Sequence, residues 1–314
     1  MSLPFLQPYF GLSNSLQTAQ ASTGGGSPTR GVFGGGYAGA ASNVIDYITI
    51  ATTGNATDFG DLTNSRAWLA GCASATRGVF AGGYTNTYVD TIDYVTIATP
   101  ANATSFGSLV LARDYLTACA SATRGLFAGG YTPSTNHNII EYITIATTGN
   151  TTDFGDLSAA KFNLASCASA TRGIFGGGYS YPSGFYNVID YVTIATTGNA
   201  TDFGDLTSNR HTFIACADAT RGIFGGGYTT STKVNIIEYI TIATTGNATD
   251  FGDLSATRSS LASCADATRG VFGGGLGTVN VNIIEYITIA TTGNVVDFGD
   301  LTVSRAYLAG CAGS

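Results

Sequence analysis

The chain has 314 residues, of which 43 are glycine and only 11% are charged, and its formal net charge is −7. So much glycine, together with 17 tyrosines and 17 phenylalanines, favours a compact β-rich protein over a helical one. The acidic balance argues against nucleic-acid binding, and the lack of an apolar run near ~18 residues argues against membrane insertion.

Residues 1–27 precede the repeated part of the chain and form a predicted N-terminal arm. No basic region opens the arm, and Pro4 and Pro8 interrupt its apolar stretch, so we expect a retained segment rather than a signal peptide. It ends in STGGGSP (22–28), which is typical of a flexible linker. Apolar residues on a tether predict an anchor to a larger assembly, and the alternative is an arm folded back onto the chain. The predicted anchor residues are Leu3, Phe5, Leu6, Tyr9 and Phe10.

From residue 28 onward one unit recurs six times at intervals of 47–49 residues, which indicates a repeat architecture. The motif TRG marks each copy, with its arginine at Arg30, Arg77, Arg124, Arg172, Arg221 and Arg269. Within one unit, turn residues separate four predicted strands, of which the second is glycine-rich and the third alternates β-branched residues with tyrosine. In the second copy these strands cover 69–74, 78–84, 91–98 and 105–109.

Four short strands per unit are typical of a propeller blade, and six units make a closed ring. A solenoid is the alternative, but the two ends of the chain favour a ring. The chain ends in RAYLAGCAGS (305–314), a first strand without the rest of its unit, and the copy that begins at residue 28 lacks that strand. We therefore predict an all-β, six-bladed β-propeller of four-stranded antiparallel blades over residues 28–314. Pairing of the C-terminal strand with the N-terminal blade would close it and remove the open edges.

Six cysteines recur once per unit, at Cys72, Cys119, Cys167, Cys216, Cys264 and Cys311. Equivalent positions in a ring lie too far apart, or face the wrong way, for disulfide bonds. We therefore expect six small buried apolar side chains, and the protein needs no oxidising compartment.

The stretch ATTGNATDFGDL (51–62) recurs in every copy with small edits, and it contains Asn-X-Thr sequons. The sequon asparagines are Asn55, Asn102, Asn150, Asn199 and Asn247, whereas Asn294 stands in the same place without the sequon. A Gly-Asn turn is therefore the predicted role, and a glycan acceptor is the alternative. Two aspartates on so short a loop are too few for calcium, and the second copy replaces both with serine, so we expect no metal.

Most charges also follow the repeat. Twelve of the thirteen Lys and Arg residues lie either in TRG or just before the first strand, and sixteen of the twenty acids lie in IDY/IEY or DFGD. Such regular matching predicts ion pairs within and between blades rather than a catalytic pocket. The two histidines, His137 and His211, lie in non-equivalent places and are expected to face solvent. With no nucleophile–base grouping in sight, we expect neither enzymatic activity nor a cofactor.

The copies differ mainly in two connections, the loop between the second and third strands and the loop between units. In antiparallel blades these loops emerge on one face, which predicts a recognition surface, with neutral drift as the alternative. Exposed aromatic and polar residues there suit sugar or protein ligands. The candidate ligand-binding residues are Tyr88, Asp90, His137, Tyr181, Phe185, Tyr186 and Lys233, and SYPSGFY (180–186) is the preferred loop.

These units resemble the kelch repeat, which has a double glycine ending its second strand and a tyrosine in its third. Here FGGGY or FAGGY supplies the glycines and IDY or IEY the tyrosine. Phenylalanines such as Phe59 stand where kelch has tryptophan, and with the short unit this suggests a divergent kelch-like propeller. The resemblance covers about 28–314 and implies the propeller fold rather than a function.

The phrases IDYITIATTGNATDFGDL and TRGVFGGGY also resemble kelch-like virion proteins of marine bacteriophages. That resemblance implies a virion surface or tail-fibre component, joined to other virion proteins by its arm and binding a host-surface glycan or protein. A stand-alone lectin or adhesin, extracellular or on a cell surface, is the first alternative. A propeller enzyme of the sialidase or oxidase type is the second.

Overall fold

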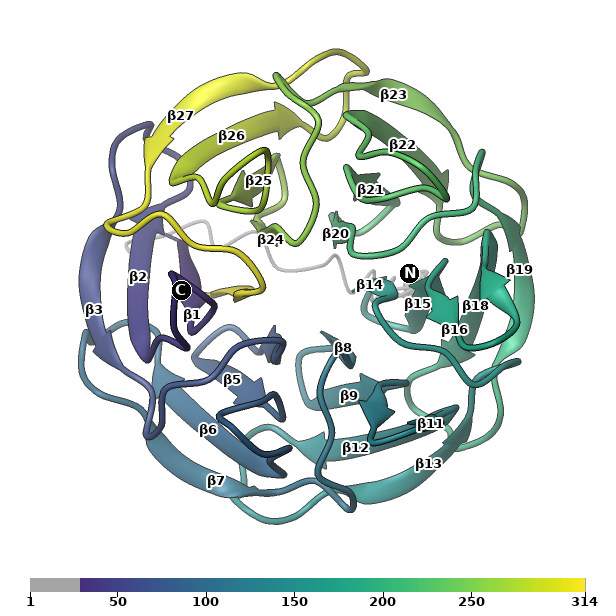
Figure 1. Cartoon of the computed structure of the whole chain (residues 1–314), viewed down its shortest axis with the longest axis horizontal. Helices are drawn as coiled ribbons and strands as arrows, with labels where there is room; N and C mark the ends of the chain where they lie inside the picture. Colours follow the sequence, from purple (N-terminus) through teal and green to yellow (C-terminus); the bar gives the residue numbers. More distant parts are fainter. Residues whose placement is uncertain (1–28, 314) are drawn as a thin grey trace, which may run out of the picture.

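The computed structural model describes residues 29–313, and these form six four-stranded antiparallel sheets around one axis (Figure 1). The first three blades, from the inner strand outward, are β28 (Ala309–Gly313), β1 (Arg30–Gly34), β2 (Val44–Thr49) and β3 (Thr57–Asp61); β4 (Ala70–Ala73), β5 (Arg77–Ala81), β6 (Thr91–Thr96) and β7 (Thr104–Ser108); and β8 (Thr117–Ala120), β9 (Arg124–Ala128), β12 (Ile139–Thr144) and β13 (Thr152–Asp156).

The other three blades repeat this order. They are β14 (Ala165–Ala168), β15 (Arg172–Gly176), β18 (Val188–Thr193) and β19 (Thr201–Asp205); β20 (Ile214–Ala217), β21 (Arg221–Gly225), β22 (Ile236–Thr241) and β23 (Thr249–Asp253); and β24 (Ala262–Ala265), β25 (Arg269–Gly273), β26 (Ile283–Thr288) and β27 (Val296–Asp300). Small hairpins extend two blades: β10 (Tyr131–Thr132) with β11 (Thr135–Asn136), and β16 (Tyr179–Ser180) with β17 (Gly184–Phe185). None of the described residues forms a helix that could span a membrane.

The predicted all-β six-bladed propeller is confirmed, including the way in which the ring closes. The C-terminal β28 pairs antiparallel with β1, and Cys311 lies opposite Val32. Figure 1 shows the yellow end of the chain returning to the purple first blade. The last strand therefore supplies the inner strand that the first blade would otherwise lack, and β1 is paired on both sides.

The second strand of each unit is shorter than its sequence predicts. In the second copy the prediction extends to residue 84, but β5 ends at Ala81. Gly82 and Gly83 follow with φ of 65° and 107°, values that disfavour any other residue and that turn the chain out of the strand. Tyr84 is not part of the strand and forms isolated bridges to Ala67 and Tyr88.

Each blade packs against the next through its own hydrophobic cluster, so the core is divided into six similar parts. All six cysteines lie in these clusters as buried free thiols, as predicted. Gly78 of one blade faces Cys311 of its neighbour so closely that a Cβ at Gly78 would lie 2.9 Å from the Cys311 Sγ. The invariant Gly of TRG thus makes room for the neighbouring thiol, which explains why these two small residues recur together.

The TRG arginines and the Asn of the Gly-Asn turn both join consecutive blades. The Arg77 guanidinium lies 4.7 Å from the Tyr94 ring centroid and donates hydrogen bonds to the Ile145 and Ala146 carbonyls of the next blade, at 3.0 and 2.9 Å. The Asn102 side-chain oxygen accepts a 3.0 Å hydrogen bond from the Asp61 amide. All six equivalent asparagines accept such a bond, including Asn294, which has no sequon. Joining neighbouring blades is therefore a structural role of this Asn, beyond the predicted turn.

The predicted ion pairs lie within blades and are buried. In each blade the cation that precedes the inner strand pairs with the acid of IDY or IEY on the third strand. The pairs are Arg66–Asp93, Arg113–Glu141, Lys161–Asp190, Arg210–Glu238, Arg258–Glu285 and Arg305–Asp46. The anchor residues Leu3, Phe5, Leu6, Tyr9 and Phe10 lie outside the described residues, so the arm remains a prediction.

Candidate ligand-binding face

The two ends of the central channel differ in composition. At one end the turns between first and second strands line it with Ala, Ser, Thr and Asp side chains, in much the same way in five blades, and the first blade contributes Ala312. The other end lies beside the loops that differ between copies, which we call the variable face. Chemistry that distinguishes one blade from another is therefore concentrated on the variable face.

The preferred loop is only partly available to a ligand. Tyr181 is 74% exposed, as predicted. Phe185 is half-buried because its ring lies 5.0 Å from Tyr179 and 5.1 Å from His211 of the next blade. Tyr186 is also half-buried and lies over the Lys161 ammonium at 5.8 Å. Two of the three aromatic side chains therefore pack against neighbouring residues.

Among the other candidates, Asp90 is exposed and Tyr88 is half-buried against Tyr84 at 5.3 Å. The Lys233 ammonium donates a 2.6 Å hydrogen bond to the Gly277 carbonyl and so joins two neighbouring blades. This contact already uses part of the donor capacity of the one cation that lies outside the repeat positions.

The expectation that both histidines face solvent is wrong. His137 is half-buried, its Nε2 lies 2.9 Å from the Thr132 hydroxyl, and burial with the nearby Arg113 charge lowers its pKa. Burial also lowers the pKa of His211 to about 4. The His137 ring contacts its own loop, whereas the His211 ring packs against Tyr179 and Phe185 of the preceding blade, a contact between copies that the local sequence does not reveal.

A continuous row of aromatic rings crosses the variable face, and we call it the aromatic crescent. Successive ring centroids lie 5.0–6.3 Å apart, distances typical of favourable aromatic pairs. The crescent contains Tyr37, Trp68, Tyr84, Tyr88, Tyr131, Phe162, Tyr179 and Phe185, and His211 extends it to Tyr228. Blade six has serine and leucine at the matching positions, Ser259 and Leu276, so the crescent is open on one side.

Where the channel opens on the variable face, six residues form a ring, which we call the mouth ring. It consists of Trp68, Tyr115, Asn163, Thr212, Ser260 and Tyr307, one per blade, each just before an inner strand. All six have φ between 51° and 60°, a left-handed conformation that is uncommon outside glycine. Each backbone N–H donates to the carbonyl of the preceding member at 2.6–3.0 Å, and the Trp68 N–H closes the circle on Tyr307.

The mouth ring opens into a cavity of about 140 Å³ whose lining residues include no charged side chain. One half is aromatic, because the Trp68 ring lies 5.4 Å from Tyr307 and 5.5 Å from Tyr115. The other half presents Asn163, Thr212 and Ser260. The Trp68 Nε1–H and the Ser260 hydroxyl are buried and have no hydrogen-bond partner among residues 29–313.

The sequence interpretation assigns variability to the loops and omits these residues. A signal was present, because the two residues after the buried cation read AW, DY, FN, HT, SS and AY in the six copies. No other position next to a predicted strand changes so completely.

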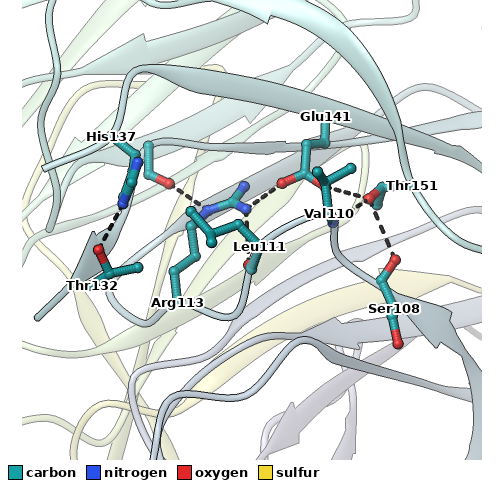
Figure 2. A network of polar contacts seen from close by, with 9 residues as sticks. Ser108, Val110, Leu111, Arg113, Thr132, His137, Glu141 and Thr151 are labelled. Carbon is teal, nitrogen blue, oxygen red and sulfur yellow. Dashed lines mark hydrogen bonds and ion pairs between the residues drawn. The ribbon is translucent and has the colours of Figure 1, made fainter. Parts of the chain in front are cut away.

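A buried network below the variable face holds the loop that leads to the mouth ring (Figure 2). The Arg113 guanidinium donates to the Glu141 carboxylate and, through Nε, to the Gly129 carbonyl at 2.8 Å. The other Glu141 oxygen accepts from the Val110 amide at 2.8 Å and from the Thr151 hydroxyl. The chain on either side of Arg113 is therefore fixed, which positions Asp114 and Tyr115 directly after it.

Asp114 is an unusual carboxyl because it is only 4% exposed and one of its oxygens has no hydrogen-bond partner among the described residues. Burial raises its pKa from 3.8 to about 7. The folded state therefore holds the proton more tightly than the unfolded state. Between about pH 4 and 7 the native state binds more protons, so the contribution of Asp114 to stability falls as the pH rises through this range.

We expect Asp114→Asn to remove this dependence. The unfolding free energy of the variant, relative to the wild type, should increase by about 2 kcal/mol between pH 5 and 8. Urea unfolding at several pH values measures it. His211 contributes with the opposite sign as the pH falls through about 4, but it does so in both proteins and cancels. Asp90→Asn, a change at an exposed carboxyl of the same face, is the control. A difference that does not change with pH would contradict the assignment.

No known protein family and no curated protein sequence matches this chain. Within residues 29–313 no group of three or more His, Cys, Asp and Glu side chains could hold a metal ion. The candidate site therefore consists of aromatic rings, amides and hydroxyls on a rigid ring.

Proposed function

We propose that this protein is a non-catalytic binding propeller that recognises a surface glycan with its variable face. The aromatic crescent is the observation that carries the proposal. Aromatic rings offer large, rigid contact areas at a low cost in conformational entropy, and the C–H faces of sugars suit them. A rigid scaffold that carries its sequence differences on one face is typical of a recognition module.

The proposed setting is the surface or tail fibre of a bacteriophage virion, with the N-terminal arm bound to other virion proteins. The wording of the repeat, which resembles kelch-like virion proteins, supports this setting. Two structural details support the kelch-like relationship. Gly82 and Gly83 end the second strand, and Tyr94 of the third strand packs edge-on against Phe106 of the fourth at 5.9 Å.

A glycan-array screen of the purified full-length protein tests the proposal. Tyr181→Ala removes the most exposed aromatic side chain of the variable face, and we expect the array signal to fall about tenfold or more. Thr53→Ala changes an exposed side chain on the opposite end of the blades and should leave the signal unchanged. Wild-type protein that binds no glycan, or equal loss in both variants, would contradict recognition by the variable face.

A further inference from the structure

The mouth ring concentrates backbone strain at one place on the variable face. Left-handed φ is unfavourable for bulky and β-branched residues, yet Trp68, Tyr115, Tyr307 and Thr212 all adopt it. Conformations of this kind persist only where the surrounding structure holds them, and they cluster at ligand-binding sites. Here the closed circle of backbone hydrogen bonds holds all six residues, so the ring is organised before any ligand arrives.

Because the circle of backbone hydrogen bonds occupies the backbone amides of the mouth ring, its side chains are the groups available to a ligand. The backbone N–H of every member is already paired with its neighbour's carbonyl. Ser260 is only 6% exposed, and its hydroxyl lacks a hydrogen-bond partner among residues 29–313, as does the Trp68 Nε1–H. An unpaired buried polar group is unfavourable, so a ligand that pairs with it gains affinity.

The size and charge of the cavity limit the class of ligand. A cavity of about 150 Å³ accepts one six-membered ring such as benzene, and this cavity measures about 140 Å³. No cation lines it, so a carboxylate or phosphate would lose hydration without gaining a partner. An aromatic half opposite a half with amide and hydroxyl groups suits a ring that has an apolar face and polar edges.

We propose, on the basis of the proposed glycan recognition, that the mouth ring is the primary subsite and binds one neutral pyranose residue of the glycan. The C–H face of the sugar packs on Trp68, flanked by Tyr115 and Tyr307. The Trp68 Nε1–H donates to a sugar hydroxyl, and Ser260 with Asn163 pairs with hydroxyls on the other side. The aromatic crescent then contacts the residues that follow in the glycan.

Trp68 is the single tryptophan of the chain, so its fluorescence reports directly on this subsite. The full-length protein is titrated with glucose, galactose, mannose and N-acetylglucosamine, each up to about 100 mM. We expect a saturable change in emission with at least one of them and none with glucuronate or sialic acid. Emission that stays constant with all four neutral sugars would overturn the subsite.

Two conservative variants test the named contacts. Trp68→Phe keeps an aromatic platform but removes the Nε1–H, and Ser260→Ala removes the hydroxyl. Each variant should bind the sugar about tenfold more weakly than the wild type, because a buried hydrogen bond is lost. Saturation-transfer NMR measures this affinity. Thr53→Ala, at the opposite end of the blades, should leave monosaccharide affinity unchanged, and thermal melts confirm that all variants fold.

The two proposals can fail separately. Array binding that depends on Tyr181 but is unaffected by Trp68→Phe would overturn the mouth-ring subsite and leave glycan recognition intact. The absence of both array binding and a fluorescence response would overturn glycan recognition itself. Array binding lost in Trp68→Phe, together with a saturable fluorescence change, supports both.

Discussion

Arg305→Ala is expected to destabilise the propeller by about 3–5 kcal/mol, because it leaves a buried carboxylate without its partner. Both side chains of the Arg305–Asp46 pair are 0% exposed, and their charged atoms lie 3.0 Å apart. The same guanidinium donates a 3.1 Å hydrogen bond to the Phe33 carbonyl of β1. This pair therefore joins the end of the chain to the first blade at the point where the ring closes.

Urea unfolding followed by circular dichroism measures the loss. Arg66→Ala is the matched control, since it breaks the equivalent buried Arg66–Asp93 pair between residues that are close in sequence. The double variant Arg305→Met/Asp46→Leu should recover most of the lost stability, because it removes both charges rather than one. An Arg305→Ala protein as stable as the wild type would contradict the structural role of the pair.

Gly107→Ala is expected to destabilise the protein by about 3 kcal/mol, at the upper end of what overpacking produces. A Cβ at Gly107 would lie 2.2 Å from the Gly149 carbonyl oxygen and 2.5 Å from its carbon, both in the next blade. Backbone atoms cannot rotate away as a side chain can. The two blades would have to separate, which also weakens the adjacent hydrogen bond from the Ser108 amide to the Asn150 side chain.

Gly149→Ala provides the control. A Cβ at Gly149 meets no atom within 4 Å, although the two glycines face each other across the same blade interface. We expect this variant to lie within about 0.5 kcal/mol of the wild type in the same unfolding assay. Equal effects of the two substitutions would mean that backbone entropy, rather than contact between blades, decides the outcome.

For some residues the sequence alone indicated the role, because the six copies of the unit can be compared with one another. The cysteines recur at equivalent positions, which ruled out disulfides and predicted burial. The Asn of the Gly-Asn turn persists where the sequon is lost, which already favoured a structural role, although the sequence did not reveal its bond to the neighbouring blade. Each inference depends on contacts that are identical in all copies, so the six copies act as repeated observations of one environment.

The ligand-binding candidates were harder to judge, because exposure depends on contacts between different copies. Phe185 and Tyr186 belong to a polar loop that looks exposed in sequence. In the structure, His211 of the next blade and Lys161 pack against them. Trp68 is the opposite case. It stands beside a predicted strand in the sequence, yet in the structure it lines the mouth of the channel.

The sequence by itself determined the number of blades, the four strands of each and the closure of the ring, because these follow from local periodicity and from the arrangement of the two chain ends. Only the tertiary structure revealed the mouth ring, on which the proposed sugar subsite rests. The mouth ring exists because six chain segments, each about one repeat apart, meet around one axis and bond to each other in a left-handed conformation. No single repeat contains that circle, so its geometry and its unpaired polar groups arise only when the blades close.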